Sequence, residues 1–378
     1  MDGSSRAPTF TLFQLFVVIS VLALIMAVSL PSIQAAREES RKAQCTNNLK
    51  SIGVALLNYE DTYRQLPFNS QSENKYILNG QKPGLEGARG SVLFKVLPFM
   101  LQDPMYGSLQ DETNNFRDDD GLLYRVWKKE DQGRIPLGYE PYFTHIHVPS
   151  FWCPSADSPK WNTNAEHDRD KHALACYAMS VGAQRRDDEA GCNSSDESIV
   201  GPLIKHCGDF HSLGFEDGPG AADWGNDYRI RYISGAFSAT YYGATLGEFI
   251  DGTSNTIVAG EFLPNRTEDA WQWGWMIGFE KGAVLGTAAP CNAPARSHGG
   301  RPVAPHESID PTGTLLSHPC AQPGDHIFGF GFKSMHAGNG CNILLGDGSV
   351  MFVSQDVDYE AWQNAGALAD KSGTSPGE

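Results

Sequence analysis

Histidine, aspartate and asparagine side chains in the second half of the chain are the first candidates for chemistry. His336 and Asp347 could serve as a general base and the carboxylate that orients it. Asp251 and Asn255 could act as oxygen ligands of a cation. Both pairs lie in turn-forming sequence, where Asp, Ser, Thr and Asn side chains usually bond the neighbouring backbone. We therefore expect Asp347 to shape a turn with His336 packed near it, and Asp251 and Asn255 to stabilise a second turn.

Three tryptophans alternate along the short segment WQWGW. In a β-strand, Trp271, Trp273 and Trp275 would share one face, because successive side chains point to opposite faces. A row of indole rings can stack on sugars or line a cleft, and it can equally form a core or a subunit contact. Ligand binding at this row is one hypothesis, and a core or subunit contact is the alternative.

The even number of cysteines predicts disulfides if the chain is exported. No two of them have CxxC spacing, so zinc-ribbon spacing is absent. We expect no metal site and no cofactor. Loop closure favours Cys192–Cys207 and Cys291–Cys320, but it does not fix the pairing. The eight candidates are Cys45, Cys153, Cys176, Cys192, Cys207, Cys291, Cys320 and Cys341.

Catalytic signatures and a nucleic-acid surface are both missing from the sequence. It contains no GxSxG, HExxH, P-loop or dinucleotide-binding fingerprint, so we expect a protein that is not an enzyme. The net charge is −16, with 45 acidic residues against 29 basic ones. Nucleic-acid binding needs a basic patch, so this balance argues against a nucleic-acid partner.

An uncharged run near the amino terminus must position everything that follows. Leu12–Leu30 contains 19 residues without a charge, and as a helix it would span roughly 28 Å, about one bilayer core. A secretory signal has a shorter apolar region, so we expect a membrane anchor. Beyond Pro31 an apolar stripe continues at helical spacing and must pack on the rest of the chain. Its members are Cys45, Leu49, Ile52, Leu56, Tyr59 and Tyr63.

Turn and strand signals predict a sheet for this second half of the helix to pack on. The residues of Asp251–Thr256 predict a turn before the apolar segment Ile257–Ala259. Asn342–Leu345 and Ser349–Ser354 flank Gly346-Asp347-Gly348, which is typical of a β-hairpin. We predict an α+β fold, with a long N-terminal transmembrane helix packed on an antiparallel sheet and a large β-rich, loop-rich extension.

The amino terminus resembles the prepilin-type cleavage and methylation segment. It has a short leader, then Phe10-Thr11-Leu12, an apolar helix, and Pro31 as the twenty-second residue from Phe10. The resemblance implies cleavage between Thr9 and Phe10 by a prepilin peptidase. Thr9 stands where prepilins usually have Gly, so we expect slow or partial cleavage. Gln14, the fifth mature residue, stands where pilins usually have Glu, and it lacks the charge thought to pair with a neighbour's amine during assembly.

Further motifs resemble the pilin-like domain-of-unknown-function family 1559, also catalogued as solute-binding-like. They are Ile33–Glu38, Gln44–Lys50, Leu57–Tyr63, Phe151–Ser155, Asp251–Thr256 with Gly260-Glu261, and His336 with Asp347-Gly348. The resemblance runs through nearly all of the chain. The family-motif positions that we take as candidate site residues are Asp251, Gly252, Thr253, Ser254, Asn255, Thr256, Glu261, His336, Asp347 and Gly348.

The leading hypothesis is a pilin-like or pseudopilin-like protein of a type II secretion or type IV pilus-like system. Its partners would be the cytoplasmic membrane, a prepilin peptidase and other pilin-like subunits, and its C-terminal domain would lie outside the cytoplasm, in the periplasm or at the cell surface. The alternative is a membrane-tethered solute- or glycan-binding protein that retains the pilin anchor. The expected segments are a leader (1–9), a long helix (10–64; transmembrane 12–30, amphipathic 32–64), an exported β-rich domain (65–366) and a frayed tail (367–378).

Overall fold

The computed structural model describes eleven segments of the chain, and the fold is reported for these alone. They are residues 12–69, 91–100, 146–162, 173–182, 235–237, 242–266, 284–287, 291–292, 295–296, 302–303 and 331–368. Several predicted features lie outside the described residues: Thr9 and Phe10, Trp271, Trp273 and Trp275, and Cys192, Cys207 and Cys320.

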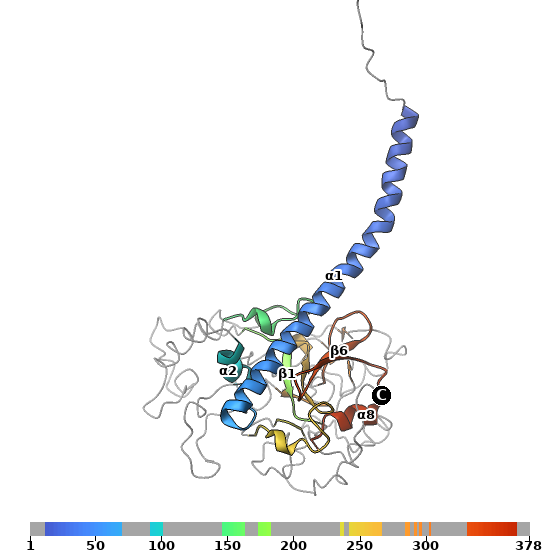
Figure 1. Cartoon of the computed structure of the whole chain (residues 1–378). Helices are drawn as coiled ribbons and strands as arrows, with labels where there is room; N and C mark the ends of the chain where they lie inside the picture. Colours follow the sequence, from blue (N-terminus) through green and yellow to red (C-terminus); the bar gives the residue numbers. More distant parts are fainter. Residues whose placement is uncertain are drawn as a thin grey trace, which may run out of the picture.

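One helix, α1 (Leu12–Tyr63), runs without interruption for 52 residues and passes through Pro31. Its first half projects from the molecule as an arm, and its second half crosses the head beside β1 and β6 (Figure 1). The helix ends where Arg64 adopts the left-handed conformation (φ 62°) and donates its N–H to the Glu60 carbonyl oxygen at 2.6 Å. The long N-terminal helix predicted from the apolar run and the stripe is confirmed.

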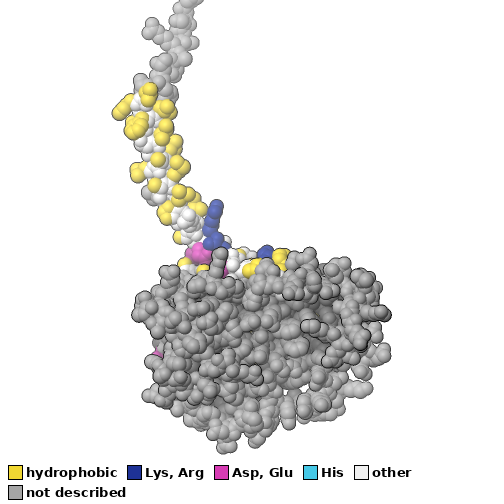
Figure 2. All heavy atoms as spheres, turned by 180° about the vertical axis from the view of Figure 1, so that it is seen from behind, with side chains coloured by type: hydrophobic (Ala, Val, Ile, Leu, Met, Phe, Trp, Pro, Cys, Tyr) yellow, Lys and Arg dark blue, Asp and Glu magenta, His cyan; other side chains and the backbone are white. Residues whose placement is uncertain are grey.

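The two halves of α1 differ in what surrounds them. In the arm, Leu12, Leu22 and Leu30 are 87%, 52% and 58% exposed. Figure 2 shows apolar side chains along the visible face of the arm and charged side chains where the arm meets the head. In the second half, the predicted stripe is buried from Cys45 to Tyr59, and only Tyr63 remains 38% exposed. Tyr63 is the last helical residue, and its ring lies against Tyr59 with centroids 4.4 Å apart.

A five-stranded sheet in the order β3-β1-β2-β6-β7 forms the head's framework. Neighbours among β1, β2, β6 and β7 are antiparallel, as predicted, while the edge strand β3 pairs parallel to β1. The strands are β1 (Tyr177–Ser180), β2 (Ile257–Glu261), β3 (Val284–Leu285), β6 (Gly340–Leu345) and β7 (Val350–Ser354); β4 (Ala295–Arg296) and β5 (Pro302–Val303) form a separate two-stranded sheet.

The core lies between α1 and this sheet. At Gly53 the helix approaches so closely that a Cβ would lie 2.7 Å from Leu344 Cδ1 and 3.3 Å from Gly348 Cα. A larger residue at this position would push the helix away from the β6–β7 hairpin. The predicted hairpin is confirmed, and Asp347 shapes its turn by accepting the Ser349 N–H at 2.8 Å while Gly348 takes φ +84°.

Short helices complete the described part of the head. They are α2 (Val92–Val96), η3 (Leu97–Met100), η6 (Pro149–Phe151), η10 (Leu246–Glu248), η11 (Pro264–Arg266) and α8 (Tyr359–Ala365). The chain just beyond the end of α8 also packs on the head. Ala367 and Leu368 are buried, and the Leu368 carbonyl accepts the Ile250 N–H at 2.9 Å, so the fold continues at least to residue 368.

Candidate functional site

A buried histidine lies between two carboxylates where the arm enters the head. His336 is fully buried; its Nδ1 lies 2.9 Å from Glu38 Oε1 and its Nε2 lies 3.1 Å from Glu261 Oε1. The three residues come from separate parts of the chain: α1, the end of β2 and the loop before β6. The imidazole therefore links the head to α1 at the end from which the arm projects.

Hydrogen bonds hold both carboxylates in place. Asn342 donates its backbone N–H to Glu261 Oε2 at 2.7 Å and its side-chain Nδ2 to Oε1 at 3.0 Å. Arg41 donates Nε to Glu38 Oε2 at 2.7 Å, and the Ser155 hydroxyl donates to Glu38 Oε1 at 2.9 Å. The surrounding fold therefore holds both carboxylates within hydrogen-bond distance of the imidazole.

The electrostatics favour a protonated imidazole. Burial lowers the pKa of His336, but hydrogen bonding and charge attraction from Glu261 and Glu38 outweigh it and raise the pKa above its usual value. Burial raises the pKa of Glu38, yet the bonds from His336, Arg41 and Ser155 prevail and lower it. When His336 is protonated, the positive charges of His336 and Arg41 balance the negative charges of Glu38 and Glu261.

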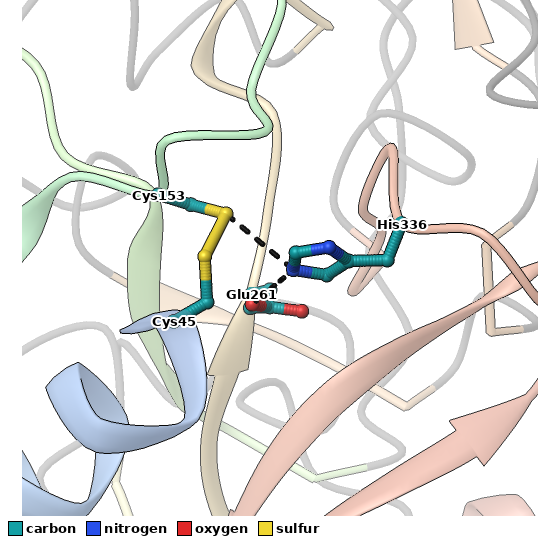
Figure 3. A group of neighbouring side chains, drawn as sticks. All are labelled: Cys45, Cys153, Glu261 and His336. Atoms are coloured by element: carbon teal, nitrogen blue, oxygen red, sulfur yellow. Dashed lines mark hydrogen bonds and ion pairs between the residues drawn. A yellow bond between two sulfur atoms is a disulfide. The ribbon is translucent and has the colours of Figure 1, made fainter. Parts of the chain in front are cut away.

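A disulfide stands directly beside this histidine. Cys45 of α1 is bonded to Cys153, which follows η6, with their Cα atoms 5.2 Å apart and a sequence separation of 108. Cys153 Sγ lies 3.5 Å from His336 Nε2. Figure 3 shows the imidazole pointing at Cys153 and Glu261, with the disulfide alongside. One atom from each of Cys45, Cys153, Glu261 and His336 lies within 4.8 Å of the others, all buried.

The remaining described cysteines are thiols. Cys291 Sγ lies 3.2 Å from Cys341 Sγ, and Cys176 is buried directly before β1. Cys320, the partner that loop closure favours for Cys291, lies outside the described residues, and the described neighbour of Cys291 is Cys341. Loop closure weighs only the length of chain between two cysteines, whereas here the fold brings Cys291 to the start of β6.

A family described as a protein of unknown function (DUF1559) matches residues 34–360, well over half of the chain. The chain belongs to this family. Comparison with curated proteins gave no match, and comparison with solved structures gave none either. Cys45, Cys153, Glu261, His336 and the second half of α1 lie within this matched range, whereas Leu12–Leu30 precedes it.

The Asp251–Thr256 motif of this DUF1559 protein is a self-bonded turn, as predicted. Asn255 Nδ2 donates to the Asp251 carbonyl at 2.8 Å, and the Thr256 hydroxyl donates to the Gly252 carbonyl at 3.2 Å. The turn is also hydrogen-bonded to the β6–β7 hairpin, because the Asp347 N–H donates to the Thr253 carbonyl oxygen at 3.1 Å. Two motifs far apart in sequence therefore form one junction, and Ser254 lies in the same turn.

His336 and Asp347 are not partners. His336 precedes the first residue of β6 and Asp347 follows the last one, so the two lie at opposite ends of the strand. The prediction that they pack together is wrong, because six extended residues separate them and each has other bonds. Asp347 is therefore not the carboxylate that orients His336 as a general base.

Sequence reasoning missed Glu38, Ser155 and Asn342 as contributors to the His336 cluster. Glu38 stands in a charged helical segment that reads as a solvated face, and its side chain is in fact only 18% exposed. The available signal was the family resemblance itself. Glu38, Cys45, Cys153, Glu261 and His336 each fall in one of the motifs, although no spacing in the sequence shows that these motifs converge.

Proposed function

We propose that this DUF1559 protein is a non-enzymatic, pilin-like or pseudopilin-like subunit of a type II secretion or type IV pilus-like system. The observation that carries the proposal is the division of α1. Its first half is apolar and exposed, long enough to cross a membrane, and its second half is part of the head's core. A single helix that serves as anchor and as core strut is the arrangement that pilin-like assembly uses.

The location of the head supports the same proposal. A disulfide between Cys45 and Cys153 persists in oxidising compartments and is rare in the cytosol. The head would therefore lie outside the cytoplasm, with the arm in the cytoplasmic membrane. Its partners would be a prepilin peptidase acting before Phe10 and neighbouring pilin-like subunits that pack against the apolar arm.

Amino-terminal mass spectrometry of the native protein tests this function. We expect chains beginning at Phe10, in a partial amount because Thr9 is bulkier than the usual Gly. Thr9→Gly should raise the cleaved fraction, and Gln14→Glu should raise the fraction that sediments with filaments. Arm residues such as Leu22 serve as the control position, because Leu22→Ile preserves the apolar surface and should change neither fraction. Chains that begin only at Met1 or Asp2 and do not respond to Thr9→Gly would reject the proposal.

The alternative is a tethered binding protein that keeps the anchor without assembling. Gln14 favours it, because Gln14 lies in the arm, is exposed and carries no charge to direct assembly. Under this alternative the native protein would stay as dispersed membrane monomers. Trp273→Ala would then abolish binding to a glycan array while leaving the melting temperature unchanged.

A further inference from the structure

We propose that the Cys45, Cys153, His336 and Glu261 cluster is a redox-gated metal site that binds one thiophilic divalent cation, represented by Zn²⁺, when the two cysteines are thiols. The ligands would be both Sγ atoms, His336 Nε2 and the Glu261 carboxylate. Among the residues that the structure describes, this is the group whose side chains gather at least three ligand atoms of the kinds that metals prefer. The inference is independent of whether the protein assembles into filaments.

The distances suit a tetrahedral ion. Bonds of about 2.0–2.3 Å to nitrogen, oxygen and sulfur place neighbouring ligands of tetrahedral zinc about 3.3–3.8 Å apart. His336 Nε2 already lies 3.5 Å from Cys153 Sγ and 3.1 Å from Glu261 Oε1. Once the disulfide is open, the main adjustment is rotation of the two cysteine side chains away from each other. The carboxylate and imidazole need almost no movement.

The surrounding shell has the form that metal sites require. A metal-bound histidine almost always donates its other ring N–H to a carboxylate or carbonyl, which fixes its tautomer. Here Glu38 Oε1 lies 2.9 Å from His336 Nδ1 and would accept that proton, which leaves Nε2 for the metal. Asn342 holds both oxygens of Glu261. Cys45, Cys153, Glu261 and His336 are each at least nine-tenths buried, so water would compete poorly for the ion.

The redox step balances with a dithiol reductant. Two electrons from the dithiol break the Cys45–Cys153 bond, the dithiol becomes a disulfide, and its two protons leave two cysteine thiols. The cation then displaces both thiol protons and the Nε2 proton of His336, all of which pass to solvent. Either linkage, disulfide or metal, joins α1 to the segment after η6, so the arm stays attached to the head in both redox states.

The test uses the full-length protein in detergent micelles, reduced and then titrated with Co²⁺, with Zn²⁺ added as competitor. We expect one Co²⁺ per chain with thiolate-to-cobalt charge-transfer absorption, no such absorption in the oxidised protein, and full displacement by Zn²⁺. Cys153→Ser and His336→Gln should remove the absorption. Glu38→Ala should weaken binding about 10–100-fold, whereas Glu39→Ala, its exposed neighbour, should not.

A second cysteine pair supplies the control for thiol binding elsewhere. The double variant Cys291→Ser and Cys341→Ser should retain the full absorption. Near-ultraviolet circular dichroism identifies any variant that fails to fold, and Glu38→Ala keeps all four ligands if His336→Gln does not fold. Absence of stoichiometric binding in the reduced wild type would overturn the proposal. So would absorption that follows Cys291 and Cys341, or equal affinities for Glu38→Ala and Glu39→Ala.

Discussion

The two halves of α1 are the same helix in two different environments. Leu22 in the arm is 52% exposed and Leu49 in the head is fully buried, although both are leucines in one uninterrupted element. In the head, one apolar stripe of the helix is covered by the sheet together with α2 and η3. In the arm the apolar residues point in every direction, and no part of the described chain covers them. The described part of the chain leaves the apolar arm uncovered, and a bilayer would supply the apolar surrounding that such a helix favours.

Deletion of the arm should have the largest effect, which is loss of membrane attachment. The full-length protein should remain in membranes through a carbonate wash, and a variant without Leu12–Leu30 should not. A milder version is Leu22→Lys, since a charge at the centre of a membrane helix costs about 2.5–3.5 kcal/mol on insertion. Ile250→Lys is the matched control, because Ile250 is an exposed apolar residue of the head (73% exposed) and should leave fractionation unchanged. A full-length protein that carbonate releases would refute the anchor.

The His336 cluster links α1 to the head where the helix passes from the exposed arm into the core. His336→Gln should lower the free energy of unfolding by about 3–5 kcal/mol, because Glu261 would be left as a buried charge without its cation. Glu39→Gln, on the exposed side of α1, should change it by less than about 0.5 kcal/mol. Chemical denaturation of the protein in micelles measures both. Equal, small losses would mean that the histidine does not tie the helix to the head.

Truncating one leucine in each half of α1 compares how much each half contributes to the stability of the head. Leu49→Ala should cost about 2–5 kcal/mol of head stability, since a large-to-small change in a core removes contacts and leaves a cavity. Leu22→Ala should leave the melting transition of the head in micelles unchanged, because no described residue of the head packs on it. A similar loss at both positions would contradict the division of α1.

The pH dependence of stability is the smallest expected effect. The pKa of His336 is raised in the fold: burial opposes the charge, but Glu261 and Glu38 more than compensate. Protonated His336 therefore contributes its full stabilisation below the unfolded pKa of about 6.5, and that contribution is lost as pH rises through the raised value. Glu38, with a lowered pKa, acts in the opposite sense and loses its contribution as pH falls through that value. Melting curves should show the alkaline loss in wild type and none in His336→Gln.

The sequence predicted the elements well and the site poorly. The helix, its buried stripe, the Asp251–Thr256 turn and the β6–β7 hairpin all follow from local patterns of apolar and turn residues. The His336 cluster does not, because its members are brought together by contacts between strands and helix far apart in the chain. Glu38 looks like any solvated helical acid until the loop carrying His336 is placed over it. His336 and Asp347 were linked by closeness in sequence, which an extended strand between them removes.

The most direct test of the divided helix places one nitroxide amino acid on each half of α1. Leu22 and Val54 are both apolar and about equally exposed, at 52% and 55%. In reconstituted vesicles, the label at position 22 should relax with lipid-soluble oxygen and the label at position 54 with a water-soluble nickel chelate. Strong and equal relaxation of both labels by the nickel chelate would place the arm in water and contradict the account.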